Sequence, residues 1–459
     1  MENVAHVEET RSYIKSCPNI FRLLTLGALQ VAKDIKSDFS QLTEILAALS
    51  RAALINGVNT EYGRLCIQKI GKLSEIEWED LKNERVYNVD GGSFDIEIFT
   101  RRPLIIRVGI YSVLIGERDI EKREDFIFTP IFVGDLIGGI RGSADYVTVI
   151  RTMAEYAAIR KILTEGYFQK PKMILLHGPL LYRFAPFEPH IFKESDIKII
   201  TEGKDEEISA FREKCKDCPA RKDWCKKLET NNEIRAICYM QFLLNEAIKA
   251  AHESNVLLAG VVERPRSTVF IRELFGYLLS YDKEMAKKLI GREIQNPAED
   301  ISEVINKTGF NDPIFLSFVL RKGEYTEFVL GKEKYEHFSK AMSGFERILP
   351  LIYYSYVKSA DDSIPFRVEV PDNLKNEERI EVLKRVYLFS QLLPNYCFPV
   401  GLDVVDKYAR VPSWMADAVS KLVLANQSIL REGLTPEELQ KLIMFLLLGK
   451  RDFYYRPQI

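Results

Sequence analysis

The feature that most constrains this chain is a change of pattern near residue 85, where helical periodicity gives way to strand-like runs. Before it, apolar residues between 20 and 55 recur at intervals of three and four, the period of an amphipathic helix. From Arg85 the runs RVYNVDGGSFDIEIF and PLIIRVGIYSVLIG are rich in Val, Ile, Tyr and Phe and are interrupted by Gly-Gly, which predicts strands around a turn. We therefore expect a helical N-terminal region over 1–84 and a new domain from residue 85.

Helix and strand patterns alternate after this point, which favours an α/β class with a mixed sheet. A helix is expected over 143–165, and KMILLHG predicts a buried strand directly after it. VLLAGVVE predicts another buried strand and TVFIRELFGYLLS a helix, while PIFLSFVL, YTEFVLG, LIYYSYV and FRVEV are further candidate strands. The helical period returns after Pro412, so we expect a helical C-terminal region over 412–459.

Composition and charge narrow the classes of protein to which the chain can belong. Its 459 residues, 46% hydrophobic and 28% charged, have the profile of a folded globular protein. The formal net charge of −2 excludes a uniformly basic nucleic-acid-binding protein, so any DNA site must be a local surface. No apolar run approaches the roughly 20 residues that span a bilayer, and the first residues lack the pattern of a secretory signal. We expect a cytoplasmic protein with no membrane partner.

Three polar residues lie where these elements can bring them together. Asp90 directly follows RVYNV, Glu155 lies beside the sheet-facing residues of the predicted helix, and His177 ends the strand KMILLHG. Two-metal nucleases need carboxylates from different elements around ions about 4 Å apart, and neutral imidazole also binds Mn²⁺. Each residue has a structural interpretation as well. Asp-Gly-Gly is an ordinary hairpin turn, and a buried acid or a strand-end histidine is often a satisfied structural group.

Six short blocks follow one another along the chain: VDGGSFDIEIF, RTMAEYAA, ILLHGPLL, LAGVVERPRST, PFRVEVP and YCFPVGLDVVDKYARV. Their order resembles that of the NurA nuclease family. The resemblance implies a nuclease domain over 85–411 with an RNase H-like, Argonaute-like core, in which helices flank a mixed sheet. It further implies activity on DNA that depends on Mn²⁺ or Mg²⁺, a role in DNA end processing and repair, a homodimer, and partnership with a hexameric HerA-type ATPase.

Carried over position by position, the resemblance assigns Asp90 to the first-strand aspartate and Glu155 to the helix glutamate of the family's metal site. The third acidic position, an Asp in the family, is His177 here. Asp90, Glu155 and His177 are therefore the candidate catalytic residues and the candidate ligands of Mn²⁺ or Mg²⁺, with His177 at a substituted position.

Two further positions depart from the family pattern and supply possible auxiliary residues. The family's Lys after the LAGVV strand is replaced by Glu263 or Arg264, and the His of its late Ala-His block by Asp406. A His at position 177 removes one negative charge that faces the ions, and Glu263 or Asp406 could restore one. Two hypotheses stay open: an active nuclease with a rearranged site, and a catalytically decayed subunit that binds DNA or docks on a translocase.

A cluster of cysteines is the most specific local signal in the chain. Cys215, Cys218 and Cys225 have the spacing C-x2-C-x6-C, and Cys238 follows after twelve residues. Four thiolates at such spacing suit tetrahedral Zn²⁺ or a 4Fe-4S cluster, and the alternative is four unliganded thiols in a charged helical insertion. We expect a Cys-rich metal-binding insertion over 205–240. No G-x4-G-K-[ST] motif occurs, so any ATP-driven motor must be a separate protein.

Overall fold

The computed structural model divides the chain into two compact units. The larger unit comprises 70–265 and 320–449, and the smaller comprises 1–69, 266–319 and 450–459. The residues that the structure describes are 20–48, 58–60, 63–65, 70–73, 77–95, 103–133, 143–165, 169–182, 191–193, 209–213, 233–272, 284, 287, 297–331, 349–393, 396–426 and 432–448.

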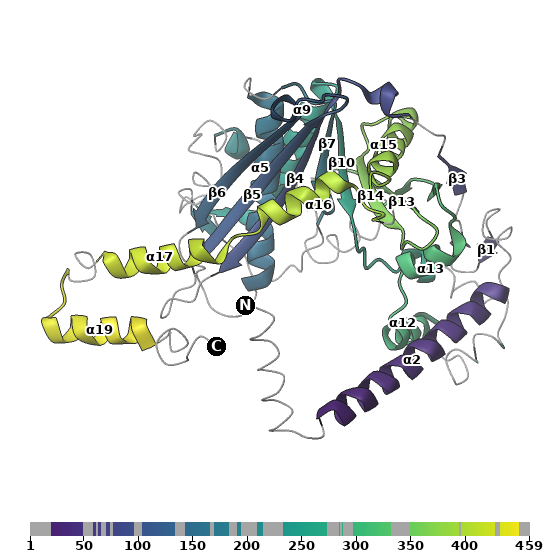
Figure 1. Ribbon diagram of the computed structural model, residues 1–459, viewed down its shortest axis with the longest axis horizontal. Helices are drawn as coiled ribbons and strands as arrows, with labels where there is room; N and C mark the ends of the chain where they lie inside the picture. Colours follow the sequence, from purple (N-terminus) through teal and green to yellow (C-terminus); the bar gives the residue numbers. More distant parts are fainter. Residues whose placement is uncertain are drawn as a thin grey trace. The chain divides into compact units, whose positions relative to one another are not determined.

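The larger unit is built on a ten-stranded mixed sheet (Figure 1). Three strands, β4 (Arg85–Asp95), β5 (Leu104–Leu114) and β6 (Glu124–Val133), form an antiparallel meander. β7 (Met173–His177) then pairs parallel to β4, and β10 (Leu257–Val262) pairs parallel to β7. The resulting order β6-β5-β4-β7-β10, with these directions, is RNase H-like. The predicted α/β class with a mixed sheet is confirmed.

Further strands extend the sheet beyond β10. β14 (Phe366–Pro371) pairs antiparallel with β10, β13 (Ile352–Val357) with β14, and β11 (Glu324–Thr326) with β13. β3 (Ile70–Lys72) pairs with β11, and the short β12 (Val329–Leu330) pairs with β13. The runs YTEFVLG, LIYYSYV and FRVEV therefore contain strands, as predicted. A separate two-stranded ribbon joins β8 (Ile191–Lys193) to β9 (Glu233–Arg235).

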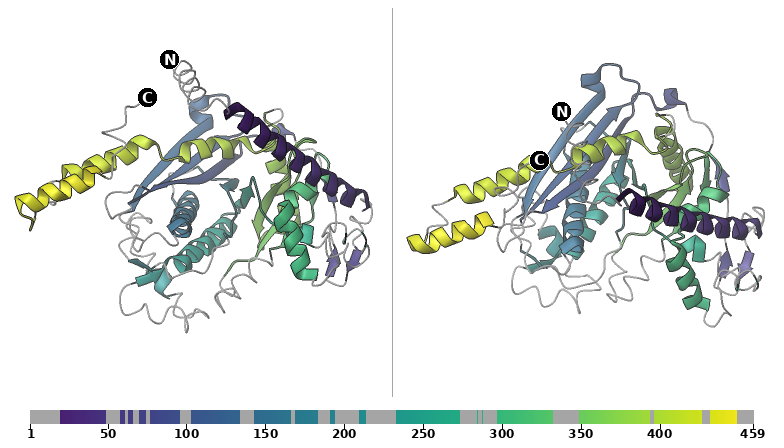
Figure 2. Two further views of the ribbon diagram at one scale, coloured as in Figure 1. Left: turned by 90° about the horizontal axis from the view of Figure 1, so that it is seen from below. Right: turned by 60° about the horizontal axis from the view of Figure 1, so that its bottom comes forward.

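Helices cover both faces of the sheet. α5 (Ser143–Thr164) and α9 (Ala236–Glu253) bury their apolar side chains against one face, and α15 (Asn376–Phe389) and α16 (Val400–Ala409) against the other. In β4 and β7, alternate residues contribute to the two cores, as the period of two in a strand requires. In the left view of Figure 2 the strands lie between the yellow-green α16 and the blue and teal helices α5 and α9. The predicted helix over 143–165 is confirmed as α5.

Two helices are described after Pro412, in agreement with the helical periodicity there. α17 (Ser413–Ala425) packs Met415 and Val419 against Ile105 of β5, and α19 (Pro436–Leu448) follows. Another short helix, α4 (Ile120–Arg123), joins β5 to β6. Among the described helices, none combines the length and the apolar character needed to cross a bilayer.

The described residues of the smaller unit lie mainly in helices. Its described elements are α2 (Ile20–Ala48), the hairpin of β1 (Val58–Thr60) and β2 (Gly63–Leu65), α12 (Pro297–Thr308) and α13 (Asp312–Val319). α2 confirms the N-terminal helix that the spacing of apolar residues predicted.

The prediction of a strand at PIFLSFVL is wrong, because this run lies in α13. Asn311 Oδ1 accepts a hydrogen bond from the Ile314 amide, and the buried Asp312 carboxylate accepts from the amides of Val269 and Ile271. The contact of Asn311 caps the start of α13, whereas Asp312 joins α13 to the segment around residue 270. An apolar run of eight residues has no alternation that distinguishes a buried strand from a buried helix.

The prediction of a turn at Gly-Gly is also wrong. β4 continues through Gly91 and Gly92, which pair with Val108 and Arg107 of β5 in an unbroken antiparallel ladder. Asp90 therefore lies inside a strand and not at a hairpin turn, and the two glycines must have another role.

Candidate metal centre

Asp90 lies beside the end of the neighbouring parallel strand. β7 pairs Leu176 with Val89 of β4 and ends one residue later at His177, so the side chains of Asp90 and His177 are adjacent. His177 Nδ1 is 3.1 Å from Asp90 Oδ2, and Asp90 Oδ1 accepts a hydrogen bond of 2.8 Å from the Gly91 amide. The end of β7 therefore lies beside Asp90 in the middle of β4.

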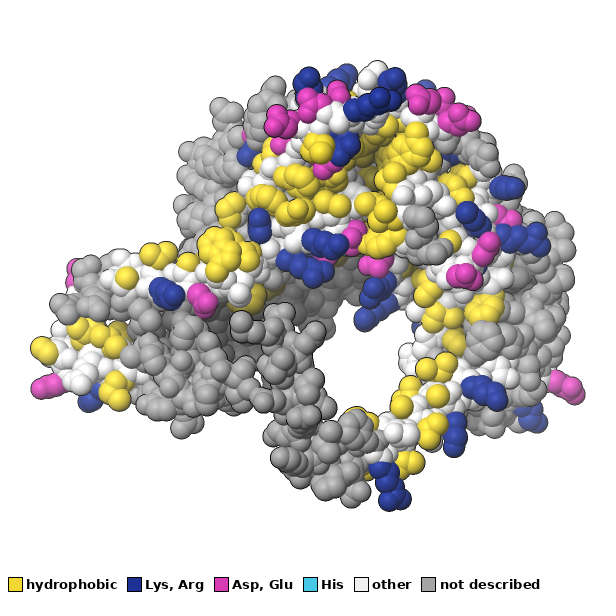
Figure 3. Space-filling view, in the orientation of Figure 1, with side chains coloured by type: hydrophobic (Ala, Val, Ile, Leu, Met, Phe, Trp, Pro, Cys, Tyr) yellow, Lys and Arg dark blue, Asp and Glu magenta, His cyan; other side chains and the backbone are white. Residues whose placement is uncertain are grey.

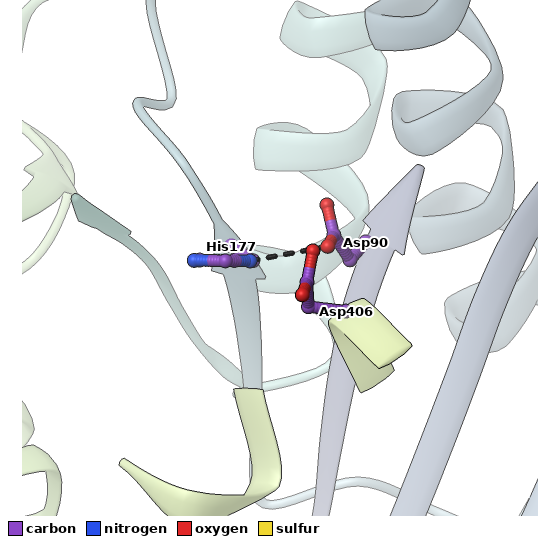
Figure 4. A group of neighbouring side chains, drawn as sticks. All are labelled: Asp90, His177 and Asp406. Atoms are coloured by element: carbon purple, nitrogen blue, oxygen red, sulfur yellow. Dashed lines mark hydrogen bonds and ion pairs between the residues drawn. The ribbon is translucent and has the colours of Figure 1, made fainter. Parts of the chain in front are cut away.

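α16 adds a third group from a distant part of the chain. One ligand atom each from Asp90, His177 and Asp406 lies within 4.8 Å of the other two, and the three side chains point toward one another (Figure 4). Ligand atoms bonded to one divalent ion at 2.0 to 2.6 Å are at most about 4 to 5 Å apart. Two carboxylates and one imidazole are donors that Mn²⁺ accepts. The group therefore fits a divalent cation in both spacing and chemistry.

Glycine residues allow α16 to lie close enough to the strands to present Asp406. A Cβ atom at Gly92 would lie 2.2 Å from the carbonyl oxygen of Ala409, at the end of α16. A Cβ atom at Gly401 would lie 2.6 Å from Asn88 Nδ2 of β4. Neither position accepts a side chain unless its neighbour moves. The second glycine of the Asp-Gly-Gly sequence thus serves the close approach of a helix.

Glu155 lies against Gly91 on the α5 side of β4. A Cβ atom at Gly91 would be 2.6 Å from Glu155 Oε1. The side chain is completely buried, and no hydrogen bond of good geometry to its carboxylate oxygens is found in the part of the chain that the structure describes, although the Gly91 amide lies close enough to lower its pKa. Burial raises the pKa of Glu155 to about 8, against the lowering effect of Arg151, and the charge of Asp90 raises it further. Glu155 is not one of the three converging ligands, but it is an unsatisfied buried acid beside them.

Arg151 connects Glu155 to the strand and to the loop after β7. Its Nε lies 3.8 Å from Glu155 Oε1, while Nη1 donates to the Gly91 carbonyl at 3.1 Å. Nη2 donates to the Tyr182 hydroxyl at 3.4 Å. The arginine therefore partly offsets the negative charge of Glu155 and fixes its surroundings.

The pKa of His177 reflects the acidic character of the group. Burial lowers it, but the hydrogen bond and the charge of Asp90, followed by the charges of Asp406 and Glu263, outweigh burial and raise it overall. The acids around the imidazole thus stabilise positive charge here, which is the property that a cation site requires.

Glu263 and Arg264, which follow β10, do not join the converging group. They pair with each other at 3.2 Å, and the Arg264 side chain is 87% exposed. The charge of Glu263 acts on His177, but the third ligand atom comes from Asp406. Of the two acids that the sequence offered as replacements for the missing charge, the structure brings Asp406 into the group.

Comparison with known proteins identifies a domain in the second half of the chain. Residues 226–411 match the family model of the NurA domain. This segment is a NurA domain. The matched segment contains Asp406, whereas Asp90, Glu155 and His177 precede it. No curated protein matches the chain.

Three solved NurA structures match this chain over most of the length of both proteins. The NurA nuclease from Sulfolobus solfataricus is 12% identical, with a TM-score of 0.49, and the match covers 90% of this chain and 99% of that one. A NurA with manganese is 13% identical, with a TM-score of 0.43 and coverage of 86% and 98%. A NurA bound to dAMP and manganese is 11% identical, with a TM-score of 0.33 and coverage of 86% and 94%.

Glu369 is a buried acid of the NurA domain that the sequence analysis missed. Its Oε2 accepts hydrogen bonds from the amides of Leu180 (3.0 Å) and Leu181 (3.4 Å), and its Oε1 lies 2.8 Å from Arg367 Nη2. The carboxylate thereby holds the segment that follows His177. The available signal was the Arg-Val-Glu alternation in FRVEV, which places opposite charges on one face of an otherwise apolar strand.

The predicted cysteine cluster lies mostly outside the described residues, which include neither Cys215, Cys218 nor Cys225. Cys238 is in the first turn of α9 of the NurA-like chain and is buried in the core beneath that helix. The Zn²⁺ or 4Fe-4S cluster stays a prediction from spacing.

Proposed function

We propose that this NurA-like chain is a DNA nuclease that depends on Mn²⁺ or Mg²⁺. The observation that carries the proposal is the convergence of Asp90, His177 and Asp406 from three separate elements, next to the unsatisfied carboxyl group of Glu155. Both the donor types and their spacing fit a divalent cation of the kind that nucleases use. The NurA domain match supports the same class of function.

An exchange of ligands supports an active site over a decayed one. The resemblance to the family leads us to expect an Asp at position 177 and a His at position 406, and here the two residue types are reversed. Because His177 and Asp406 belong to one group, the reversal keeps two carboxylates and one imidazole around the same space. The total charge of the three ligands is therefore the same as in the family pattern, which is the result expected of compensating substitutions.

The reaction that we infer is hydrolysis of a phosphodiester. When bound, a divalent cation supplies a Lewis acid that activates water and neutralises charge on the phosphate. Asp90, His177 and Asp406 would hold it, and the contact between Asp90 and His177 orients the imidazole. Oxygen from water forms a bond to phosphorus, the bond from phosphorus to one sugar oxygen breaks, and that oxygen takes up a proton.

The test is degradation of end-labelled linear DNA with Mn²⁺ by the wild type and site variants. We expect Asp90→Ala to lower the rate at least about 100-fold. Asp406→His should also lower it, because it removes a carboxylate, and adding His177→Asp to Asp406→His should restore most of the activity. Asp119→Ala, an exposed acid that caps α4, is the control and should not change the rate.

Two results would contradict the proposal. Full activity of Asp90→Ala would place the nuclease site elsewhere. An inactive wild type that gains activity with His177→Asp would favour the alternative, a decayed NurA-like subunit that binds DNA or docks on a translocase.

We further propose a homodimer that processes DNA ends in repair with a HerA-type ATPase, as the family resemblance implies. The absence of a P-loop motif from the sequence supports a separate motor protein. Light scattering after size-exclusion chromatography should give twice the 52.9 kDa chain mass, and a HerA-type hexamer should co-elute with the protein. A monomer, or a hexamer that elutes alone, would contradict this assembly.

The spacing of Cys215, Cys218, Cys225 and Cys238 supports a second, structural metal in the chain, either Zn²⁺ or a 4Fe-4S cluster. Elemental analysis of the anaerobically purified protein should find one Zn or about four Fe per chain. Cys218→Ser should lower this content. Neither element in the wild type would favour unliganded thiols.

A further inference from the structure

Arg410 is a cation paired with one of the three proposed ligands. It follows α16 directly, one turn after Asp406, and its Nη2 lies 2.8 Å from Asp406 Oδ2. The carboxylate of Asp406, and then those of Asp403 and Asp90, raise the pKa of the Arg410 guanidinium. The positive charge therefore acts on two of the proposed ligands.

This ion pair contributes little to stability. The Arg410 side chain is 73% exposed, and water screens the attraction in exposed pairs of this kind. Only one of the five N–H groups of its guanidinium is directed at Asp406 by this contact. The arginine is therefore available to a ligand in solvent.

A second guanidinium is fixed at the same end of α16. Arg107 Nη1 donates a hydrogen bond of 3.3 Å to the Arg410 carbonyl, and its Cζ lies 4.1 Å from the centre of the Phe128 ring. The stacked arginine holds the end of the helix against β5 and adds positive charge there. Basic and acidic side chains accordingly lie next to one another beside α16 (Figure 3).

We propose that Arg410 binds a phosphate of the DNA strand at this site once a divalent cation has replaced it at Asp406. The inference rests on the proposed nuclease function and specifies how the site recognises its substrate. A guanidinium is a planar fork that donates two parallel hydrogen bonds to two phosphate oxygens. When Asp406 binds the cation, the Arg410 guanidinium no longer pairs with it and can bind an anion beside the ion.

In this handover, Arg410 leaves Asp406 to the cation and binds a phosphate. It makes a prediction that a purely structural role of Arg410 does not make. In the absence of a cation, the guanidinium neutralises Asp406 and competes with any ion for that oxygen. Removal of the guanidinium should therefore have opposite effects on the two ligands of the site. It should strengthen the binding of Mn²⁺ and weaken the binding of DNA.

The experiment compares Arg410→Ala and Arg410→Lys in the full-length chain. Lys122→Ala is the matched control, because Lys122 is 72% exposed, pairs with Asp119 at 3.6 Å, and lies beyond the opposite end of β5 from Arg107. Mn²⁺ binding is measured alone by calorimetry. DNA binding is measured by fluorescence anisotropy of a labelled oligonucleotide in Ca²⁺, over a series of salt concentrations.

We expect Arg410→Ala to bind Mn²⁺ a few-fold more tightly and DNA about 10-fold more weakly. The slope of log affinity against log salt should decrease in magnitude by about one, the value for one lost phosphate contact. Arg410→Lys should recover the salt slope and part of the affinity, because it keeps the charge but not the fork. Lys122→Ala should match the wild type for both ligands.

Each contrary result has a separate meaning. If the wild type cleaves DNA and Arg410→Ala binds DNA as tightly as the wild type, the inference is wrong and the nuclease function stands. If Arg410→Ala weakens Mn²⁺ and DNA binding together, Arg410 supports the local structure and the handover is wrong. If the wild type binds no Mn²⁺, the nuclease proposal fails and the inference fails with it.

Discussion

Glu369 and Glu155 are both completely buried in the larger unit, but their surroundings satisfy them to different degrees. Glu369 has an arginine at 2.8 Å and two backbone amides that donate to it. No hydrogen bond of good geometry to Glu155 is found within the described residues, and its nearest cation, Arg151, is 3.8 Å away. Buried acids are normally paired, so an unsatisfied one beside other ligands indicates a missing partner. The comparison separates an acid that completes the fold from one that we propose is a ligand.

One glycine lies beside the segment that Glu369 holds, and another lies beside Glu155. At Gly260 of β10 a Cβ atom would lie 2.6 Å from the Gly178 carbonyl oxygen, in the segment that Glu369 holds. At Gly91 the same atom would lie 2.6 Å from Glu155 Oε1. Because Gly260 has no side chain, a backbone segment can lie against it. Because Gly91 has none, the Glu155 carboxyl group can do the same. Substitutions at the acids and at their glycines therefore test the comparison.

The largest difference is expected in the pH dependence of stability. The pKa of Glu155 is raised from 4.5 to about 8 in the folded chain, chiefly by burial. Between these values the folded state keeps a proton that the unfolded state has lost. The contribution of Glu155 to the free energy of unfolding is thus fully present below pH 4.5 and is lost as the pH rises through about 8. At about 1.4 kcal/mol per pKa unit, this loss is at most about 5 kcal/mol.

Glu155→Gln should remove this loss, since the amide does not ionise. Urea unfolding in EDTA at a series of pH values should show the variant gaining stability relative to the wild type as the pH rises. Parallel curves for the two proteins would mean that Glu155 is satisfied in solution and would break the comparison with Glu369.

The next effect is the loss of the satisfied acid. Glu369→Ala leaves Arg367 without its carboxylate and two buried amides without their acceptor, which should lower the free energy of unfolding by about 3 to 5 kcal/mol. Urea unfolding at pH 7 measures this change in the free energy of unfolding. Glu377→Ala, an exposed acid in the first turn of α15, is the control and should cost less than about 1 kcal/mol. A loss from Glu369→Ala as small as that of the control would show that this pair is not structural.

The smallest effects are expected at the two glycines. Gly260→Ala should cost about 1 to 3 kcal/mol, because its methyl group meets backbone atoms that cannot move alone. Gly91→Ala should cost less stability but should weaken Mn²⁺ binding, because its methyl group displaces the Glu155 carboxyl group. Unfolding measurements and Mn²⁺ calorimetry on both variants test this pair. Equal losses of stability with unchanged Mn²⁺ binding would contradict it.

The sequence predicted the sheet better than it predicted the contacts across it. Runs of Val and Ile identified most strands, and the sequence placed His177 correctly at the end of its strand, whereas Asp90 lies inside β4. The interpretation of Asp-Gly-Gly as a turn was wrong because that rule is local, whereas Gly92 is required by the carbonyl group of Ala409, more than 300 residues away. Asp406 was named only through the family resemblance. Glu369 was missed because its partners lie on a loop with no pattern of its own.

The most direct test of the central claim is a crystal structure of the protein soaked in Mn²⁺, with anomalous diffraction used to locate the ion. We predict a peak bounded by Asp90, His177 and Asp406, with the Glu155 carboxyl group turned toward it and Arg410 released from Asp406. A protein without a peak at this position, or with Asp406 still paired to Arg410 and manganese held by other residues, would contradict the account.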